Sequence, residues 1–552
     1  MKKLLAVLVA GALFLVPLNA SAAVKAGDVC KKAGTTATAN GKKFTCIKSG
    51  KKLVWNGGVV IAAPKPKATP IASPSPMPSA VPTPESSPSS KPTPTPSPTQ
   101  SSAPLVDYTK SYSTDGGYFT EFNDPCAFDP NPPAEWKAFQ DYYYGSNRCV
   151  SQLKLGKYFL GNARPTSPLS PNANYQNVSE CKIQIPDRNS NLSIGFEQPG
   201  TQRAIFREEK KYPAPKTVFQ LIGIYADDTA RPSKSPKAEY SKYLNFLKEW
   251  IEYSSDGESR VELRYPEEYV KIPGNLGDYK VVHTNNWDNS EHQRLNRDVV
   301  AAVDPFINFS GANIGIIVAP GGTPLDILKQ GALGPLRTAE GQVPFAISQY
   351  SDTYSNPNRT IFANLAAPSW WLHELYHAGY GLEDHYGDDT KNVNSEYGLG
   401  WWSLMNPTSG DLTIWEKWIL GFTLDSQVHC LTGSGTSTHW LAPSSVKTTE
   451  KKAVVIKIST TKVIVLESIR PGSLHYKIPT TSEGVLVYTV DLTVKQRDYG
   501  MKLVLPKNRN PNKGPFFLAE APLRVGESVT TDGVTITVVE SGTFGDVVKV
   551  EK

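Results

Sequence analysis

The sequence predicts an α+β multidomain protein, in which an α/β layer with one additional helix is followed by an all-β, sandwich-like C-terminal domain. Two observations carry this prediction. Between residues 216 and 322, apolar runs of strand length alternate with stretches of helical spacing. After about residue 429, short β-rich runs are separated by turn residues, and no stretch has convincing helical spacing. A chain of 552 residues is also too long for one ordinary hydrophobic core.

The N-terminus has the pattern of a secretory signal peptide. Lys2 and Lys3 precede an apolar run over residues 4–18, and small residues close the pattern at Ala22. The apolar run is too short to span a membrane comfortably. We therefore expect residues 1–22 to be removed and the mature protein to be secreted, either extracellular or associated with the cell wall.

A small basic module is predicted at residues 23–61. Positions 24–57 hold eight lysines and one acidic residue, Asp28, which gives this stretch a net charge of +7. The whole chain has a formal charge of +6, so the remainder of the chain is close to neutral. This charge suits an anionic cell-wall polymer or membrane surface, and it suits equally a solvated module that keeps the N-terminus soluble. We expect no nucleic-acid partner. Residues 62–104, rich in Pro, Ser and Thr, predict an extended linker.

The six cysteines predict disulfides. An even number of cysteines in an exported chain favours three disulfides over free thiols, and none of them has the C-x-x-C spacing of a metal or redox site. Cys30 and Cys46 lie together in the basic module and are expected to pair. The other four, which allow three pairings, are Cys126, Cys149, Cys181 and Cys430.

The body of the chain begins with a loop-rich region at residues 105–215, which we expect to be tied by disulfides. Residues 216–428 follow as the predicted α/β layer with its helix, and residues 429–552 as the β-rich domain. The strands expected in the α/β layer cover residues 217–227, 260–272 and 313–322, and its helices residues 238–255 and 292–307. The β-rich runs are 453–459, 462–470, 483–491, 500–506 and 533–541.

The motif His-Glu-x-x-His occurs at residues 373–377 within the stretch PSWWLHELYHAGYGLEDHYG. Pro368 suits the first turn of a helix and Gly379 suits its end. On such a helix, His373 and His377 are four residues apart and project from one face, within reach of one metal ion. Glu374 would then lie beside the ion as a general base. The spacing predicts a zinc site rather than a chance pair of core histidines.

A third zinc ligand is expected shortly after the second histidine. The candidates are Glu383, Asp384 and His385 in the turn, and Glu396 further along the chain. Imidazole is the commoner ligand, which favours His385 on chemistry alone. Two glycines closely follow Glu396 and weaken the second helix that this ligand would need. Met405, in a turn rich in Pro and Gly, has the position of the methionine that packs beneath the metal in metzincins.

These motifs resemble the M6-type, immune inhibitor A-like metallopeptidases secreted by bacteria. The family pattern H-E-x-x-H-x-x-G-x-x-D places zinc on two histidines and an aspartate, and this chain has one additional residue before its Gly-Leu pair. Aligning GLEDHY (381–386) with the family's Gly-Leu-x-Asp-x-Tyr implies that Asp384 is the third ligand. Residues 310–315 replace the acidic run that often binds calcium, so the resemblance gives little support for calcium. The stretches that carry the resemblance are AAVDPFINFS, LHELYHAGYGLEDHYG, SLMNPTSGDLTIWEKWILGF and EGVLVYTVD.

The resemblance implies a metzincin-like, secreted zinc endopeptidase that hydrolyses extracellular proteins or peptides. Its zinc would be bound by His373, His377 and Asp384, and Glu374 would be the general base. Two alternatives stay open at this stage. One is a cell-surface binding protein whose peptidase fold is inactive, and the other is a gluzincin-type peptidase that uses Glu396 as its third ligand.

Overall fold

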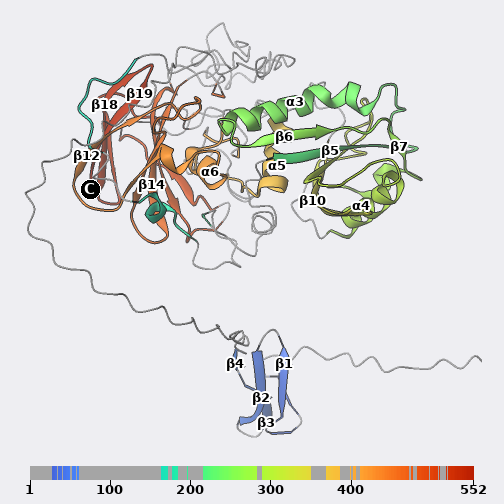
Figure 1. Ribbon diagram of the computed structural model, residues 1–552. Helices are drawn as coiled ribbons and strands as arrows, with labels where there is room; N and C mark the ends of the chain where they lie inside the picture. Colours follow the sequence, from blue (N-terminus) through green and yellow to red (C-terminus); the bar gives the residue numbers. More distant parts are fainter. Residues whose placement is uncertain are drawn as a thin grey trace, which may run out of the picture. The chain divides into compact units, whose positions relative to one another are not determined.

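The computed structural model describes much of the chain from residue 28 onward (Figure 1). The signal peptide, the linker at 62–104 and Cys126, Cys149, Pro368 and Glu396 lie outside the described residues. The described residues are 28–30, 32–33, 35–39, 42–49, 52–56, 59–60, 163–171, 177–184, 195–196, 216–282, 289–349, 369–385, 398–399, 402–405, 411–470, 474–475, 482–495, 498–507, 509, 518 and 520–552.

The chain divides into two compact units, Met1–Gln100 and Ser101–Lys552. The first contains a small antiparallel sheet in the order β1-β2-β3, with β4 paired to β2. Cys30 and Cys46 are buried and form the disulfide that the sequence predicts, with their Cα atoms 5.9 Å apart. The strands are β1 (Thr36–Ala39), β2 (Lys42–Ser49), β3 (Lys52–Trp55) and β4 (Val59–Val60).

The second unit is a mixed α/β structure with several sheets and few helices in its described part. Its first sheet has the order β6-β5-β8-β10-β9, with β7 paired to β5. All neighbours are parallel except the β9–β10 pair. The strands are β5 (Lys216–Tyr225), β6 (Arg260–Arg264), β7 (Val270–Lys271), β8 (Ile314–Val318), β9 (Gly331–Thr338) and β10 (Gly341–Ser348).

Helices cover both faces of this sheet, so the side chains of its central strands alternate between two cores. In β5, Phe219 and Leu221 join the core shared with α3 (Pro236–Ser254) and α5 (Ser369–Tyr380). Ile222 and Ile224 join the core shared with α4 (Ser290–Val303). Figure 1 shows α3 and α4 on opposite sides of the strands.

The hairpin of β9 and β10 is absent from the elements that the sequence predicts. β9 contains Gly334 and Pro335, two residues that are unusual in strands, and the β9–β10 register shifts near Ala346, so the sequence lacks the clean alternation of a strand. Proline is tolerated because β9 is an edge strand.

Two further sheets complete the second unit. One has the order β11-β13-β14-β15-β16 and the other the order β12-β19-β18-β17. They share one hydrophobic core. Val454 and Leu466 contribute to it from the β11-β13-β14-β15-β16 sheet, and Ile536 and Val548 from the β12-β19-β18-β17 sheet. This arrangement of two sheets fits the expected sandwich. The strands are β11 (Val428–Leu431), β12 (Thr436–Leu441), β13 (Ala453–Lys457), β14 (Lys462–Ile469), β15 (Gly484–Asp491), β16 (Met501–Leu503), β17 (Ser528–Thr531), β18 (Val534–Gly542) and β19 (Gly545–Glu551).

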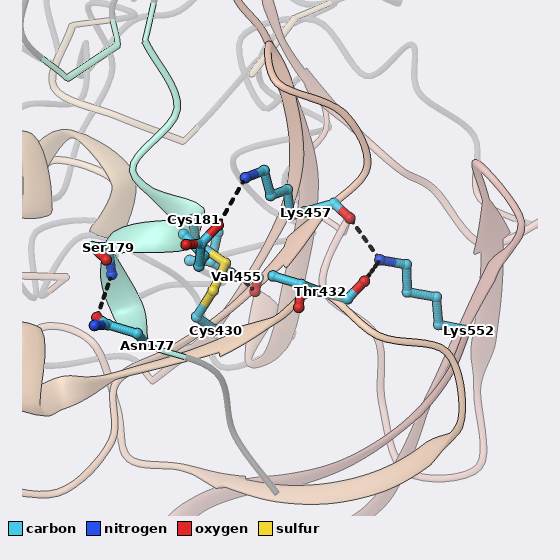
Figure 2. The surroundings of a disulfide bond; sticks show 9 residues. Asn177, Ser179, Cys181, Cys430, Thr432, Val455, Lys457 and Lys552 are labelled. Carbon is cyan, nitrogen blue, oxygen red and sulfur yellow. Dashed lines mark hydrogen bonds and ion pairs between the residues drawn. A yellow bond between two sulfur atoms is a disulfide. The ribbon is translucent and has the colours of Figure 1, made fainter.

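A second disulfide joins Cys181 to Cys430, with their Cα atoms 5.7 Å apart (Figure 2). Cys181 ends the 3-10 helix η2 (Val178–Cys181), and Cys430 lies in β11. The bond therefore ties the described part of the loop-rich region to the first β-rich sheet. Among the helices that the structure describes, none combines the length and apolar character needed to cross a membrane.

Candidate metal centre

The helix that carries the His-Glu-x-x-His motif is α5, and it packs closely on the first sheet. A Cβ atom on Gly379 would lie 2.3 Å from Cδ1 of Ile314 in β8, so any larger residue there would require the Ile314 side chain to move. The predicted helix end at Gly379 is one residue too early. The helix continues to Tyr380, and Gly381 takes the left-handed conformation beyond it, with φ of 67°.

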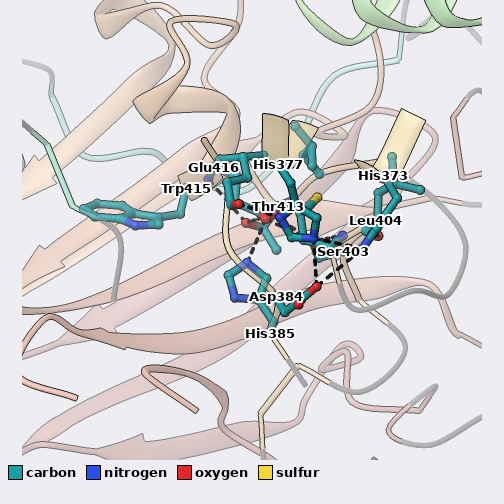
Figure 3. Close-up of polar contacts among 12 residues, drawn as sticks. His373, His377, Asp384, His385, Ser403, Leu404, Thr413, Trp415 and Glu416 are labelled. Carbon is teal, nitrogen blue, oxygen red and sulfur yellow. Dashed lines mark hydrogen bonds and ion pairs between the residues drawn. The ribbon is translucent and has the colours of Figure 1, made fainter. Parts of the chain in front are cut away.

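Three side chains from α5 and the following turn converge on one point (Figure 3). Nε2 of His377 lies 3.1 Å from Nε2 of His373 and 3.0 Å from Oδ1 of Asp384. Nε2 of His373 lies 3.4 Å from the same carboxylate oxygen. Within the part of the chain that the structure describes, these residues form a group close enough to hold a metal ion.

Backbone carbonyls orient both imidazole rings. Nδ1 of His373 donates to the carbonyl of Leu404 at 2.8 Å, and Nδ1 of His377 donates to the carbonyl of Leu382 at 2.7 Å. With the proton held on Nδ1, each neutral ring presents the lone pair of Nε2 to the other ligand atoms. Two lone pairs and a carboxylate oxygen then face one another, an arrangement that a cation would stabilise.

The dimensions of this triangle fit zinc. A tetrahedral zinc ion with bonds of about 2.0–2.1 Å needs ligand atoms ~3.3 Å apart, and the three observed separations lie between 3.0 and 3.4 Å. His373 is 1% exposed and Asp384 8% exposed, so these two ligand side chains are held inside the protein. Two nitrogens and one carboxylate oxygen are also a donor set that zinc accepts.

The charged groups of this site act strongly on one another's pKa values. Burial lowers the pKa of His377, but the Asp384 carboxylate and, more weakly, Glu374 raise it, to a net pKa of about 9. Burial raises the pKa of the Asp384 carboxyl, but the two histidines lower it well below its usual range. Glu374 is 9% exposed and lies on α5 next to His373. Its carboxylate contributes to the raised pKa of His377, so its charge lies within electrostatic range of the group.

Of the other candidate ligands, His385 faces away from this group. Its Nε2 lies 2.8 Å from Oε1 of Glu416 on α6 (Ile414–Ile419), and both side chains are buried. Burial lowers the pKa of His385, but Glu416 raises it to a net increase. Glu383 is buried and lies outside the group of three, and Glu396 is not among the described residues.

The segment 402–405 lies against the site. Met405 is fully buried, its carbonyl accepts the backbone N–H of His385 at 3.1 Å, and the preceding carbonyl of Leu404 orients His373. Sequence reasoning identified Met405 but missed Leu404, Ser403 and Glu416. The one available signal for Glu416 was its place three residues after Thr413, which is the spacing of a helix capping box.

Comparison with known proteins reveals only distant structural similarity. No protein-family model matches the sequence, and no curated protein matches it either. Among solved structures, the chain is similar to wild-type OgpA from Akkermansia muciniphila, with 12% identity, 66% of this chain and 97% of that chain covered, and a TM-score of 0.22. Catalytically inactive OgpA in complex with an O-glycopeptide substrate matches with 14% identity, 60% and 91% coverage, and a TM-score of 0.21. TM-scores this low give no support to any particular activity of this chain.

Proposed function

We propose that this protein is a secreted zinc endopeptidase that cleaves peptide bonds in extracellular proteins. The observation that supports this best is the convergence of Nε2 of His373, Nε2 of His377 and Oδ1 of Asp384, all within 3.4 Å of one another beside Glu374. The resemblance of the surrounding motifs to M6-type metallopeptidases, with a metzincin-like arrangement of helix, turn and methionine, points the same way.

In the proposed reaction, His373, His377 and Asp384 hold the ion and Glu374 handles the protons. Zinc, when bound, would lower the pKa of a water molecule and polarise the scissile carbonyl. Glu374 accepts a proton from the attacking water and returns it to the leaving amine, so the carboxylate ends the cycle as it began. The Nδ1 bonds to Leu404 and Leu382 hold one proton on Nδ1 of each imidazole and turn each Nε2 toward the position of the ion.

The zinc content of the mature protein and its hydrolysis of casein or gelatin test this proposal together. Glu374→Gln should retain about one zinc ion per chain and lose nearly all hydrolysis, because Glu374 moves protons and is not a ligand. His373→Ala should lose both zinc and hydrolysis, because the two ligands that are left hold zinc poorly. Substantial hydrolysis by Glu374→Gln would refute the mechanism, and a parent protein without zinc would refute the function.

A second role, binding to an anionic surface, is supported by the N-terminal unit. Lys32, Lys43, Lys48 and Lys52 are exposed there around the buried Cys30–Cys46 disulfide. Exposed lysines on a small rigid unit suit an anionic cell-wall polymer or membrane surface. A binding protein with an inactive peptidase fold would keep this surface and show no hydrolysis, so the casein assay separates the two functions.

A further inference from the structure

We infer that Glu416 is a positioning residue that sets the geometry of the metal site through His385 and Ser403. The inference rests on the proposed zinc site, which it deepens. Glu416 is fully buried in the first turn of α6 and does not contact the ion's ligands directly. Its effect on the metal would therefore pass through the backbone of two segments.

These two segments supply or orient every proposed ligand. The turn at 381–385 contains Asp384, and its Leu382 carbonyl accepts from Nδ1 of His377. The segment at 402–405 provides the Leu404 carbonyl that accepts from Nδ1 of His373. A displacement of either segment would turn an imidazole or move the carboxylate, so the triangle of ligand atoms depends on how both are held.

The Glu416 carboxylate binds both segments at once (Figure 3). Oε1 contacts Nε2 of His385, the residue after Asp384, at 2.8 Å. The Ser403 hydroxyl donates to the carboxylate at 2.9 Å and also accepts the N–H of Met405 at 3.0 Å. A direct bond from His385 N–H to the Met405 carbonyl joins the two segments to each other.

The remaining contacts of Glu416 belong to its own helix. Oε2 accepts the hydroxyl and the backbone N–H of Thr413, each at 2.7 Å, which completes a capping box. Burial raises the pKa of Glu416, but His385 and Thr413 lower it to a net decrease, so the group is a carboxylate at neutral pH. A buried carboxylate with hydrogen-bond partners on three segments is a rigid link between them.

The backbone conformation of Ser403 is a separate indication that the contacts around Glu416 hold this segment in place. Its φ is 108°, a conformation that side chains with a Cβ rarely adopt. The serine therefore accepts a backbone conformation that glycine would adopt more easily, and in doing so it places its hydroxyl against Glu416 and the N–H of Met405. Strain of this kind persists where the surrounding contacts fix the conformation.

Glu416→Gln tests the inference, because glutamine can still complete the capping box but cannot accept from His385 and Ser403 as a carboxylate does. Glu467→Gln is the matched control. Glu467 is buried, accepts the N–H of Ile414 at the start of the same helix, and has a pKa raised to about 7, chiefly by burial. Its hydrogen bond to Ile414 lies outside both metal-site segments, and glutamine resembles its protonated form.

The readouts are the zinc dissociation constant, by competition with a chromophoric chelator, and the visible absorption of the Co²⁺-substituted protein, which reports ligand geometry. We expect Glu416→Gln to bind zinc about 10- to 100-fold more weakly than the parent and to show an altered Co²⁺ spectrum. Glu467→Gln should match the parent in both. Ser403→Gly serves if Glu416→Gln does not fold, because it relaxes the backbone while removing the hydroxyl, and it should also weaken zinc binding.

A folded Glu416→Gln protein with the parent's zinc affinity and Co²⁺ spectrum would overturn the inference and leave the proposed function intact. If Glu416→Gln does not fold, a Ser403→Gly protein with the parent's affinity overturns it. Weakening of the same size in Glu467→Gln would show a general loss of stability and would also overturn it. A parent that binds zinc but hydrolyses nothing refutes the peptidase and leaves the positioning role standing, whereas a parent without zinc refutes both.

Discussion

Zinc affinity should rise about tenfold for each pH unit up to about pH 9, because a proton competes with zinc for His377. The pKa of His377 is about 9, since the effect of Asp384 outweighs burial. At pH 7 only about 1% of the metal-free chains then have a neutral His377, and the apparent zinc dissociation constant is ~100-fold weaker than above pH 9. Each pH unit below 9 costs about 1.4 kcal/mol of binding free energy.

The same proton has the opposite effect on the metal-free fold. The pKa of His377 is raised from its ordinary value of 6.5 to about 9 in the folded state. The resulting stabilisation is therefore fully present below pH 6.5 and is lost as the pH rises through 9. The shift corresponds to roughly 3 kcal/mol of unfolding free energy. This figure already includes the interaction of His377 with Asp384, so nothing is added for Asp384. Above pH 9 the metal-free protein should melt at a lower temperature while zinc binds more tightly.

Two measurements check this. Chelator competition at four pH values between 6 and 9 gives the slope of affinity, and calorimetry in two buffers of different ionisation enthalpy gives the protons released. We expect a slope near tenfold per pH unit and release of about one proton at pH 7. Glu467→Gln, which removes another buried group with a pKa of about 7, should keep the slope. A dissociation constant that is flat from pH 7 to 9 would refute the assignment of the proton to a metal ligand.

The structure supports three further predictions. Asp384→Ala should weaken zinc binding by more than the about 10- to 100-fold loss expected for His385→Ala, as measured by chelator competition, and the reverse order would assign the third ligand to His385. Replacing Cys181 and Cys430 together by alanine opens a loop with a sequence separation of 249. The lost restriction on the unfolded chain should lower the free energy of unfolding by up to ~5 kcal/mol, and an unchanged denaturation midpoint would contradict this. Deleting residues 23–104 should leave casein hydrolysis intact and reduce binding to anionic cell walls or vesicles in a sedimentation assay, and unaltered binding would remove the proposed role of the basic module.

Features set by local spacing were predictable from the sequence. His373 and His377 share a helix face because four residues make about one turn, whatever surrounds the helix. The alternation of Phe219 and Leu221 with Ile222 and Ile224 follows from the two-residue period of a strand. Cys30 and Cys46 pair as predicted because they are close in sequence within a small unit.

Features that join distant segments were decided by the tertiary structure. Asp384 and His385 are adjacent, and the sequence alone favoured each for a different reason. In the fold, Asp384 turns to the histidines of α5, while His385 turns to Glu416, 31 residues later in the chain. That choice depends on where α6 packs, which no local pattern encodes.

Long-range packing also decided the second disulfide and the orientation of His373. The pairing of Cys181 with Cys430 spans 249 positions, and the carbonyl of Leu404 that orients His373 belongs to a separate segment 31 residues away. A backbone carbonyl carries no side-chain signature, so its role is invisible in the sequence. Helical spacing fixed that His373 and His377 point to the same position, whereas long-range packing decided which neighbouring groups orient them there.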